Sequence, residues 1–237
     1  MTMLRISLFF AMIPILFVQF RAYANTVDEI LKKTDAIRNP AQEFVMEVEV
    51  KSSADQDGPW MGEVSIKGNN KTLIKTLAPK REVGQNYLML GTDIWAYTPR
   101  IKRALRVSLS QKLTGEAANG DIGRMRWHGD YDGKIRKTSS DRWELDLEAN
   151  KKGLTYDKMR VWIKKNYQPI EAEFLSKTGT VLKRASYSGF EKIHGEVRPT
   201  LMKITNALDK EKWSVIRIVK MEPRALPDSL FQKTSLE

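Results

Sequence analysis

The sequence predicts an all-β fold with a few helices, and three observations support this prediction. Apolar and polar residues alternate at period two along most of the chain, which is typical of strands with one buried and one solvated face. Clusters of Gly, Asn and Asp separate these runs. A clear helical period occurs in one stretch, residues 26–38. We therefore expect antiparallel strands joined by short connections.

About a dozen strands are predicted in this way, at residues 44–50, 60–67, 72–77, 87–90, 94–98, 101–107, 142–148, 158–163, 170–174, 181–190, 200–206 and 212–220. About eight strands close a barrel whose interior is filled by its own side chains. A larger number encloses a cavity, takes up a plug, or packs as a filled sandwich. The inward residues are apolar, so any cavity is expected to be apolar.

The chain begins with a stretch that has the features of a secretory signal peptide, at residues 1–24. Arg5 precedes an apolar run at residues 6–20, and residues 22–24 form an A-x-A cleavage site. A membrane anchor is the alternative, but the run is shorter than the roughly 20 residues that a bilayer requires. We expect cleavage after Ala24 and a single domain over residues 25–237.

Composition restricts the classes of function. The chain contains no cysteine, which excludes disulfides, thiolate metal sites and cysteine acylation. Its formal net charge is +11, of which Arg5 and Arg21 leave with the predicted signal, so the mature chain keeps +9. An exported basic protein meets phospholipid head groups, lipopolysaccharide or an acidic partner. We expect no nucleic-acid partner, and we expect a monomer.

The predicted helix at residues 26–38 starts with a capping box formed by Thr26 and Glu29. Its apolar stripe consists of Val27, Ile30, Leu31, Thr34 and Ile37. An amphipathic helix before a β region lays such a stripe on an apolar surface. It serves either as a fixed plug of the sheet or as a lid over a ligand cavity.

Residues 84–107 form the centre of the predicted sheet, as a meander of three short strands. Trp95 and Tyr97 share one face of the middle strand. Four cations follow within seven positions, and we call them the basic rim: Arg100, Lys102, Arg103 and Arg106. The basic rim either protects a sheet edge from pairing or docks an anionic head group or a membrane partner.

Residues 108–126 interrupt the strand pattern. This connection contains three glycines and is too long for an ordinary hairpin loop. Leu109, Leu113 and Ala117 fit one face of a short helix beginning near Ser110. Long connections often act as lids or docking loops, although a surface insertion without a role is equally compatible with the pattern.

Catalytic and metal-binding signals are weak. His128 and His194 have no partners at metal-binding spacing. Asp121, Asp130 and Asp132 offer carboxylates for acid/base chemistry, but they lie beside glycines as loop residues do. We therefore expect no enzyme activity, no metal and no cofactor.

One motif carries a family resemblance: Gly91-Thr92-Asp93-Ile94-Trp95-Ala96-Tyr97-Thr98-Pro99-Arg100-Ile101-Lys102-Arg103. Together with the preceding residues 75–84, it resembles the LolA-like outer-membrane lipoprotein-sorting proteins. The basic segment at residues 99–103 is more typical of the divergent LolA-like branch, whose members are often linked with RND-type transporters.

The resemblance implies an incomplete antiparallel β-barrel of roughly eleven strands, covered by helices around an apolar cavity. It implies a periplasmic carrier that binds the acyl chains of lipoproteins and shuttles them towards the outer membrane. The implied partners are an acylated lipoprotein or another lipid, an inner-membrane exporter of ABC or RND type, and an outer-membrane acceptor.

On this basis we assign three groups of residues as hypotheses. The expected cavity lining is Phe44, Met46, Val48, Val64, Met89, Trp95 and Tyr97. The expected lid or docking residues are Ile30, Leu31, Leu109 and Leu113. The expected docking surface is the basic rim. Two other functions remain open: a periplasmic scaffold that binds without transporting, and an envelope hydrolase that uses Asp130 or Asp132.

Overall fold

The computed structural model of the chain describes residues 26–39, 43–124 and 126–236. The predicted signal peptide and its cleavage site lie outside these residues. The main strands are β1 (Phe44–Ser52), β2 (Trp60–Lys67), β3 (Lys71–Ala78), β4 (Asn86–Leu90), β5 (Asp93–Thr98), β6 (Arg103–Val107), β9 (Tyr131–Thr138), β10 (Arg142–Ala149), β11 (Lys158–Lys164), β12 (Pro169–Leu175), β13 (Val181–Ile193), β14 (Glu196–Asn206) and β15 (Trp213–Pro223).

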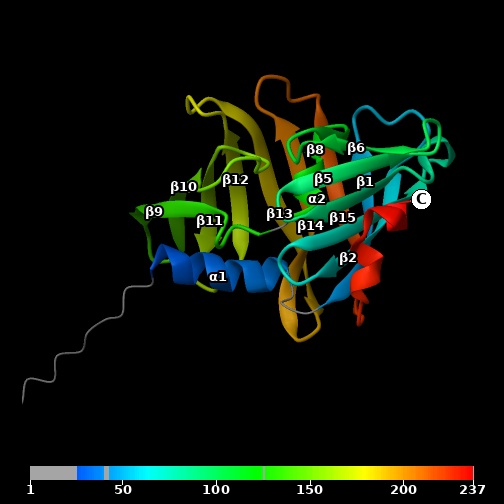
Figure 1. Cartoon of the computed structure of the whole chain (residues 1–237). Helices are drawn as coiled ribbons and strands as arrows, with labels where there is room; N and C mark the ends of the chain where they lie inside the picture. Colours follow the sequence, from blue (N-terminus) through cyan, green and yellow to red (C-terminus); the bar gives the residue numbers. More distant parts are fainter. Residues whose placement is uncertain (1–25, 40–42, 125, 237) are drawn as a thin grey trace, which may run out of the picture.

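Within the described ranges these 13 strands form one antiparallel sheet, in the order β6-β5-β4-β3-β2-β1-β15-β14-β13-β12-β11-β10-β9. The first and last main strands, β1 and β15, pair in the middle of the sheet. The sheet curves without closing, so β6 and β9 are its edges (Figure 1). This is the predicted incomplete antiparallel barrel, with more strands than the roughly eleven expected.

The remaining elements are short. Two of them, β7 (Lys112–Thr114) and β8 (Ala117–Ala118), pair in a small separate sheet. The helices are α1 (Val27–Arg38) and α2 (Asn119–Gly123), with 3-10 turns η1 (Lys80–Glu82), η2 (Asp228–Phe231) and η3 (Lys233–Leu236). None of the helices in the described ranges is long and apolar enough to cross a membrane.

Helix α1 confirms the sequence prediction almost to the residue. The Thr26 hydroxyl accepts the backbone N–H of Glu29 at 3.2 Å, as an N-cap does. Ile30, Leu31 and Thr34 are buried against the sheet. The helix contacts β9 near its start and β14 near its end, so it spans the inner face of that half of the sheet (Figure 1).

The connection between β6 and β9 covers the other half of the inner face. The helix expected from Ser110 is wrong: that segment forms the β7–β8 hairpin, and the helical turn α2 follows it. Leu109, Ala117 and Ile122 from this connection are buried in the same apolar cluster as the inner residues of β1 and β2. The connection and α1 therefore cover the inner face together, and we call these two segments the cover. The connection is not a surface insertion.

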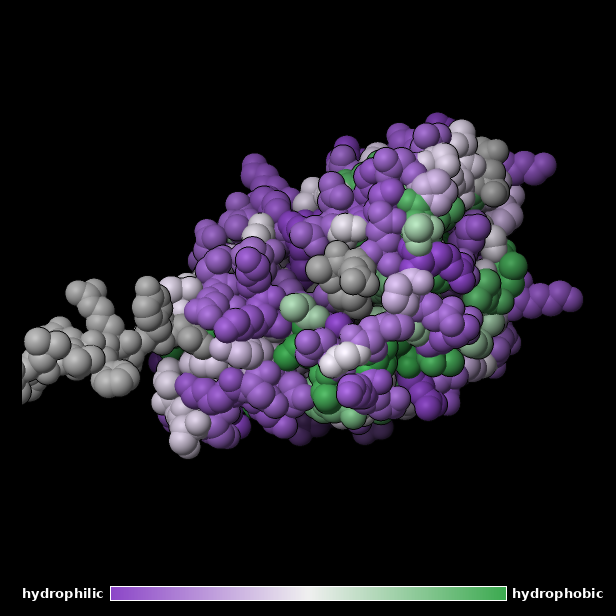
Figure 2. All heavy atoms as spheres, turned by 90° about the horizontal axis from the view of Figure 1, so that it is seen from below, coloured by the Kyte–Doolittle hydropathy of each residue, from purple (hydrophilic) through white to green (hydrophobic). Residues whose placement is uncertain are grey.

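A second, smaller apolar cluster lies on the outer face. It contains Val45, Leu73 and Leu88 from the sheet, with Leu226, Phe231 and Leu236 from the chain end. The end of the chain thus crosses the outer side of the β1–β5 half. Seen from below, the surface of the molecule is mainly hydrophilic, with apolar residues exposed in small areas (Figure 2).

Candidate functional site

Among the described residues, two small hollows lie on the inner side of the sheet, beneath the cover. The first, of about 30 Å³, is lined by Arg38, Gly120, Asp121, Arg124, Arg126, Trp127, Tyr131, Thr155, Tyr156, Met159, Phe174, Tyr187 and Met202. The second, of about 40 Å³, is lined by Arg38, Asp121, Tyr187, Pro199, Thr200, Leu201, Met202, Ile216 and Ile218. They share Arg38, Asp121, Tyr187 and Met202. We call them the aromatic hollow and the aliphatic hollow.

The volume of these hollows shows that this conformation is closed. Pockets that hold small molecules usually measure roughly 300 to 1,000 Å³. Hollows of about 30 and 40 Å³ hold little more than a water molecule each. A ligand larger than water can therefore enter these two hollows only when part of the cover moves away from the sheet.

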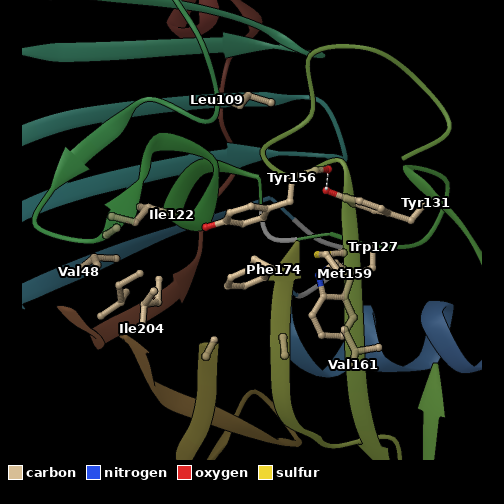
Figure 3. Close-up of a cluster of buried hydrophobic side chains, with 14 of the residues drawn as sticks. Val48, Leu109, Ile122, Trp127, Tyr131, Tyr156, Met159, Val161, Phe174 and Ile204 are labelled. Carbon is tan, nitrogen blue, oxygen red and sulfur yellow. Dashed lines mark hydrogen bonds between the residues drawn. The ribbon is translucent and has the colours of Figure 1, made fainter. Parts of the chain in front are cut away.

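Stacked rings form the wall of the aromatic hollow. Tyr156 and Phe174 are parallel, with ring centres 3.9 Å apart, and Trp127 and Met159 lie beside them (Figure 3). The Tyr131 hydroxyl donates to the Tyr156 carbonyl at 3.1 Å. Trp127 comes from the connection, and the other side chains come from β9, the β10–β11 loop, β11 and β12, so the hollow lies where the cover meets the sheet.

Arg38, the last residue of α1, lies where the two hollows meet. Its guanidinium lies 3.8 Å from the ring centre of Trp127 and 5.7 Å from that of Tyr187, which are cation–π distances. Its side chain is 9% exposed. It forms an ion pair with Oδ1 of Asp35 at 3.2 Å.

Asp35 joins α1 to the connection. Its Oδ2 accepts the backbone N–H groups of Trp127 and His128, each at 2.7 Å. Burial raises the pKa of Asp35 to about 6, while the nearby Arg38 and the two backbone N–H groups oppose this shift. We call this set of contacts the Asp35 latch.

Asp121 is the second buried acid of the site. The Tyr156 hydroxyl donates to both of its carboxylate oxygens at 3.0 Å, and the Ala118 N–H donates to Oδ2 at 2.8 Å. Burial raises the pKa of this carboxyl above its usual value. Asp121 thus fixes α2 against the ring stack.

Asp130 is held by three cations and is not a solvent-exposed loop residue. Arg124 forms a bidentate pair with it at 2.6 and 2.8 Å, and Arg126 and Lys151 each approach within 2.8 Å. These partners hold the pKa of the buried carboxyl at about 2, despite burial. The cluster anchors the end of the connection, because Arg124 also donates to the Gly91 carbonyl.

Two further contacts attach the cover to the sheet. Arg198 of β14 donates to the carbonyls of Ala36 and Ile37 at the end of α1, at 2.5 and 2.6 Å. Glu116, between β7 and β8, donates its N–H to Ser214 at 2.8 Å and accepts from Asn206 at 3.2 Å. The cover is therefore attached both by buried apolar side chains, such as Ile30, Leu31 and Ile122, and by individual polar contacts.

Five of the seven residues expected to line a cavity face the inner side of the sheet: Phe44, Met46, Val48, Val64 and Met89. The four expected lid residues join them, with Ile30, Leu31 and Leu109 buried and Leu113 partly buried. None of these nine lines the two hollows of the described structure. They form the filled part of the interior beside the hollows.

Trp95 and Tyr97 face the other way, which corrects the expectation that they share a face with Met46. Trp95 pairs with Leu88 in the sheet, and both belong to the outer cluster. Ile94 is the buried inner residue of β5. The period of the strand is as predicted, but the inward face is the opposite one.

The four residues of the basic rim are exposed, on the edge strand β6 and the turn before it. Arg106 forms an ion pair with Asp93 on the neighbouring strand. None of the four lines either hollow among the described residues. The basic rim is thus an outward-facing feature of the sheet edge.

Sequence reasoning missed the residues that line the hollows, above all Arg38, Asp121, Tyr187 and Met202. Met202 and Tyr187 lie in predicted strands, but the pattern did not distinguish them from other inward residues. Arg38 has the usual position of a cation at a helix end. Within the described ranges, no cluster of three or more His, Cys, Asp or Glu residues suits a metal ion.

The comparison with known proteins identifies the family. No curated protein matches the chain. A family model described as "Uncharacterized protein" matches residues 68–237. An outer membrane lipoprotein-sorting protein domain from Vibrio parahaemolyticus is 21% identical, with a TM-score of 0.74 over 88% of this chain and 97% of its own, and supports the fold alone.

A LolA superfamily protein from Nitrosomonas europaea is similar in both sequence and structure. It is 35% identical, and the match covers 90% of this chain and 100% of that chain with a TM-score of 0.82. The motif at residues 91–103 and the open, helix-covered sheet agree with this result. The chain belongs to the LolA superfamily.

Proposed function

We propose that this protein is a periplasmic carrier that takes up acyl chains between its curved sheet and its cover. The resemblance implies acyl chains of lipoproteins as cargo, delivered towards the outer membrane. The observation that carries the proposal is the apolar inner face of the sheet beneath a cover that packs on it and is also joined to it by separate polar contacts. An inner-membrane exporter of ABC or RND type and an outer-membrane acceptor are the proposed donor and recipient.

The energetics support such a role. Removing one methylene from water contributes about 0.8 kcal/mol, so a chain of about 16 carbons contributes on the order of 10 kcal/mol. Opening the cover breaks the Asp35 latch and the stack of Arg38 on Trp127. Charge-assisted hydrogen bonds contribute about 1.5 to 3 kcal/mol each, so the bound chain can offset a limited opening.

We propose that α1 is the moving part of the cover. Its contacts with the connection are the Asp35 latch, the Arg38 stack and a 3.0 Å contact between Oδ1 of Asp28 and Nε2 of His128. The connection itself is tied to both halves of the sheet through Glu116 and Arg124. When α1 moves, the inner residues Met46, Val48 and Val64 extend the two hollows into one cavity.

The first experiment identifies the cargo. The mature chain is produced in a bacterial periplasm, purified without detergent, and its organic extract is analysed by mass spectrometry. A stoichiometric acylated species is expected, and its mass distinguishes a lipoprotein from another lipid. An empty extract from protein that also fails to bind an added fluorescent fatty acid would reject the carrier function and favour the scaffold.

A second experiment tests whether α1 moves. An ideal Cβ at Gly133 lies 2.8 Å from Cγ1 of Val27 and 2.5 Å from Cδ2 of Leu147, so the pair Val27→Cys and Gly133→Cys, combined with Leu147→Ala to make room, can link α1 to β9. The protein has no other cysteine, which keeps the link unique. We expect the oxidised variant to lose fatty-acid uptake and the reduced variant, its matched control, to keep it. Equal uptake of fatty acid by the oxidised and reduced variants would show that the ligand enters without movement of α1.

The basic rim is proposed as the docking element of the carrier. Its exposed cations lie at a sheet edge next to two exposed apolar residues, Ile101 and Leu105. Such a surface suits an anionic membrane or an acidic partner. Replacing Arg100, Lys102 and Arg103 by Gln should weaken binding to anionic vesicles while fatty-acid uptake stays unchanged.

A further inference from the structure

The two hollows beneath the cover differ in chemistry. Three arginines line the aromatic hollow, Arg38, Arg124 and Arg126, against a single carboxylate, Asp121. The aliphatic hollow continues from Arg38 along apolar residues of β14 and β15: Pro199, Leu201, Met202, Ile216 and Ile218. A hollow with a cationic wall thus lies beside an apolar one, with Arg38 in the wall of both.

The three arginines are not equally committed to partners. Arg124 and Arg126 both contact Asp130, which Lys151 also contacts, so three cations share one carboxylate. Arg38 has one ion-pair contact, to Oδ1 of Asp35 at 3.2 Å, among the described residues. The other oxygen of Asp35 accepts two backbone N–H groups. Around the aromatic hollow there are therefore more cations than carboxylates. The cations are Arg38, Arg124, Arg126 and Lys151, and the carboxylates are Asp35, Asp121 and Asp130.

The orientation of Arg38 suits recognition of an anion. Its guanidinium is stacked on Trp127, and the ring centre of Tyr187 lies 5.7 Å from it. Stacking holds the plane of the guanidinium and directs its N–H edge towards acceptors, one of which is Oδ1 of Asp35 at 3.2 Å. A planar edge of this kind binds carboxylate or phosphate with two parallel hydrogen bonds. The side chain is 9% exposed, so such a contact would form in a shielded environment.

We propose that Arg38 is the head-group subsite of the carrier: it binds the carboxylate or phosphate of an anionic amphiphile whose acyl chain lies in the aliphatic hollow. This inference depends on the proposed function, since it assigns a chemical class to the cargo. It selects a lipid with a free acidic group over a lipoprotein, whose acylated end is neutral. The ligand enters while α1 is displaced, and the stack of Arg38 on Trp127 re-forms as α1 closes over the bound head group. The acyl chain then extends past Met202 towards Ile216 and Ile218.

The test compares three ligands that share one acyl chain length: hexadecanoate, hexadecyl phosphate and hexadecanol. We expect the wild-type protein to bind at least one of the two anions about tenfold more tightly than the alcohol, because an anion adds a charge-assisted hydrogen bond to Arg38 that the alcohol cannot form. The stronger of the two anions identifies a carboxylate or a phosphate head. The variant Arg38→Met should bind all three ligands with the affinity of the alcohol.

Arg198→Gln is the matched control. Arg198 is also buried and also contacts the last turn of α1, but it lines neither hollow of the described structure. This variant should keep the preference for anions even if all affinities fall together. Arg38→Lys, which keeps the charge without the planar edge, should retain part of the preference and serves where the Met variant is unfolded.

The outcomes separate the two proposals. Binding of all three ligands with equal affinity by the wild type, or an anion preference that survives in Arg38→Met, overturns the head-group subsite and leaves the carrier standing. Binding of none of them by the wild type overturns the carrier and the subsite together. Loss of preference in Arg38→Met, with hexadecanol still bound, supports the subsite.

Discussion

The carboxylate of Asp35 accepts the backbone N–H of Trp127 at 2.7 Å, across the junction between α1 and the connection. The same oxygen accepts the N–H of His128 at 2.7 Å. The two segments are 92 residues apart in sequence, and this contact is what joins them into one cover over the inner face of the sheet.

Replacing Asp35 by Ala should destabilise the protein by about 1 to 3 kcal/mol, because two partly buried N–H groups lose their acceptor. Urea denaturation measures the change. Asp28→Ala is the control, since Asp28 also lies on α1 and contacts His128, but its side chain is 77% exposed. Surface pairs of this kind contribute little. Equal effects in the two variants would contradict a specific role for Asp35.

Uptake of fatty acid should become faster as pH rises from about 4 to about 6. Burial raises the pKa of Asp35 from 3.8 to about 6, so the closed protein binds this proton more tightly than a form in which Asp35 is solvated. Protonated Asp35 therefore stabilises the closed form relative to the open one. This stabilisation is complete below about pH 3.8 and is lost as pH rises through about 6. The charged groups that face Asp35 are Arg38 and His128.

Stopped-flow fluorescence measures this rate. Asp35→Asn removes the titrating group and should flatten the part of the pH profile that Asp35 causes. A profile that is unchanged in Asp35→Asn would assign the pH dependence to another group.

Asp130→Asn should cost about 3 kcal/mol or more, because Arg124, Arg126 and Lys151 lose the anion they share. In the wild type, the low pKa of Asp130, about 2, gives stability that is present above pH 4 and is lost as pH falls from about 4 through 2. Thermal denaturation from pH 2 to pH 7 measures both effects. Asp132→Asn, at an exposed neighbour, should change neither.

Replacing Trp95 by Ala should loosen the end of the chain and leave lipid uptake intact. Trp95 belongs to the outer cluster with Leu226 and Phe231, and Lys233 lies 4.4 Å from its ring centre. Limited proteolysis should therefore cleave the segment after Pro223 faster in this variant. If the Trp95→Ala variant is folded but no longer takes up fatty acid, Trp95 lines the ligand cavity after all.

Much of the fold could be predicted because its signals are local. The hydroxyl of Thr26 and the stripe beginning at Ile30 define α1 within its own residues. Alternation in β10 and β11 is complete over the length of each strand. By contrast, β9 was missed: apart from Tyr131 its residues are exposed, and the strand forms because its backbone pairs with β10. Backbone hydrogen bonding to a neighbouring strand does not depend on side chains, so an edge strand formed in this way has no apolar pattern in its sequence.

By itself, the sequence determined the all-β class, the helix at the start of the described chain and the period of most strands, since each depends on residues close together in the chain. The tertiary structure decided which face points inward, because period two has two equivalent phases and β4 and β5 carry apolar residues on both, with Met89 and Ile94 inside and Leu88 and Trp95 outside. It also decided that Arg38, Asp121 and Met202 meet around one site. These residues come from α1, α2 and β14, and only packing of the cover against the sheet brings them together.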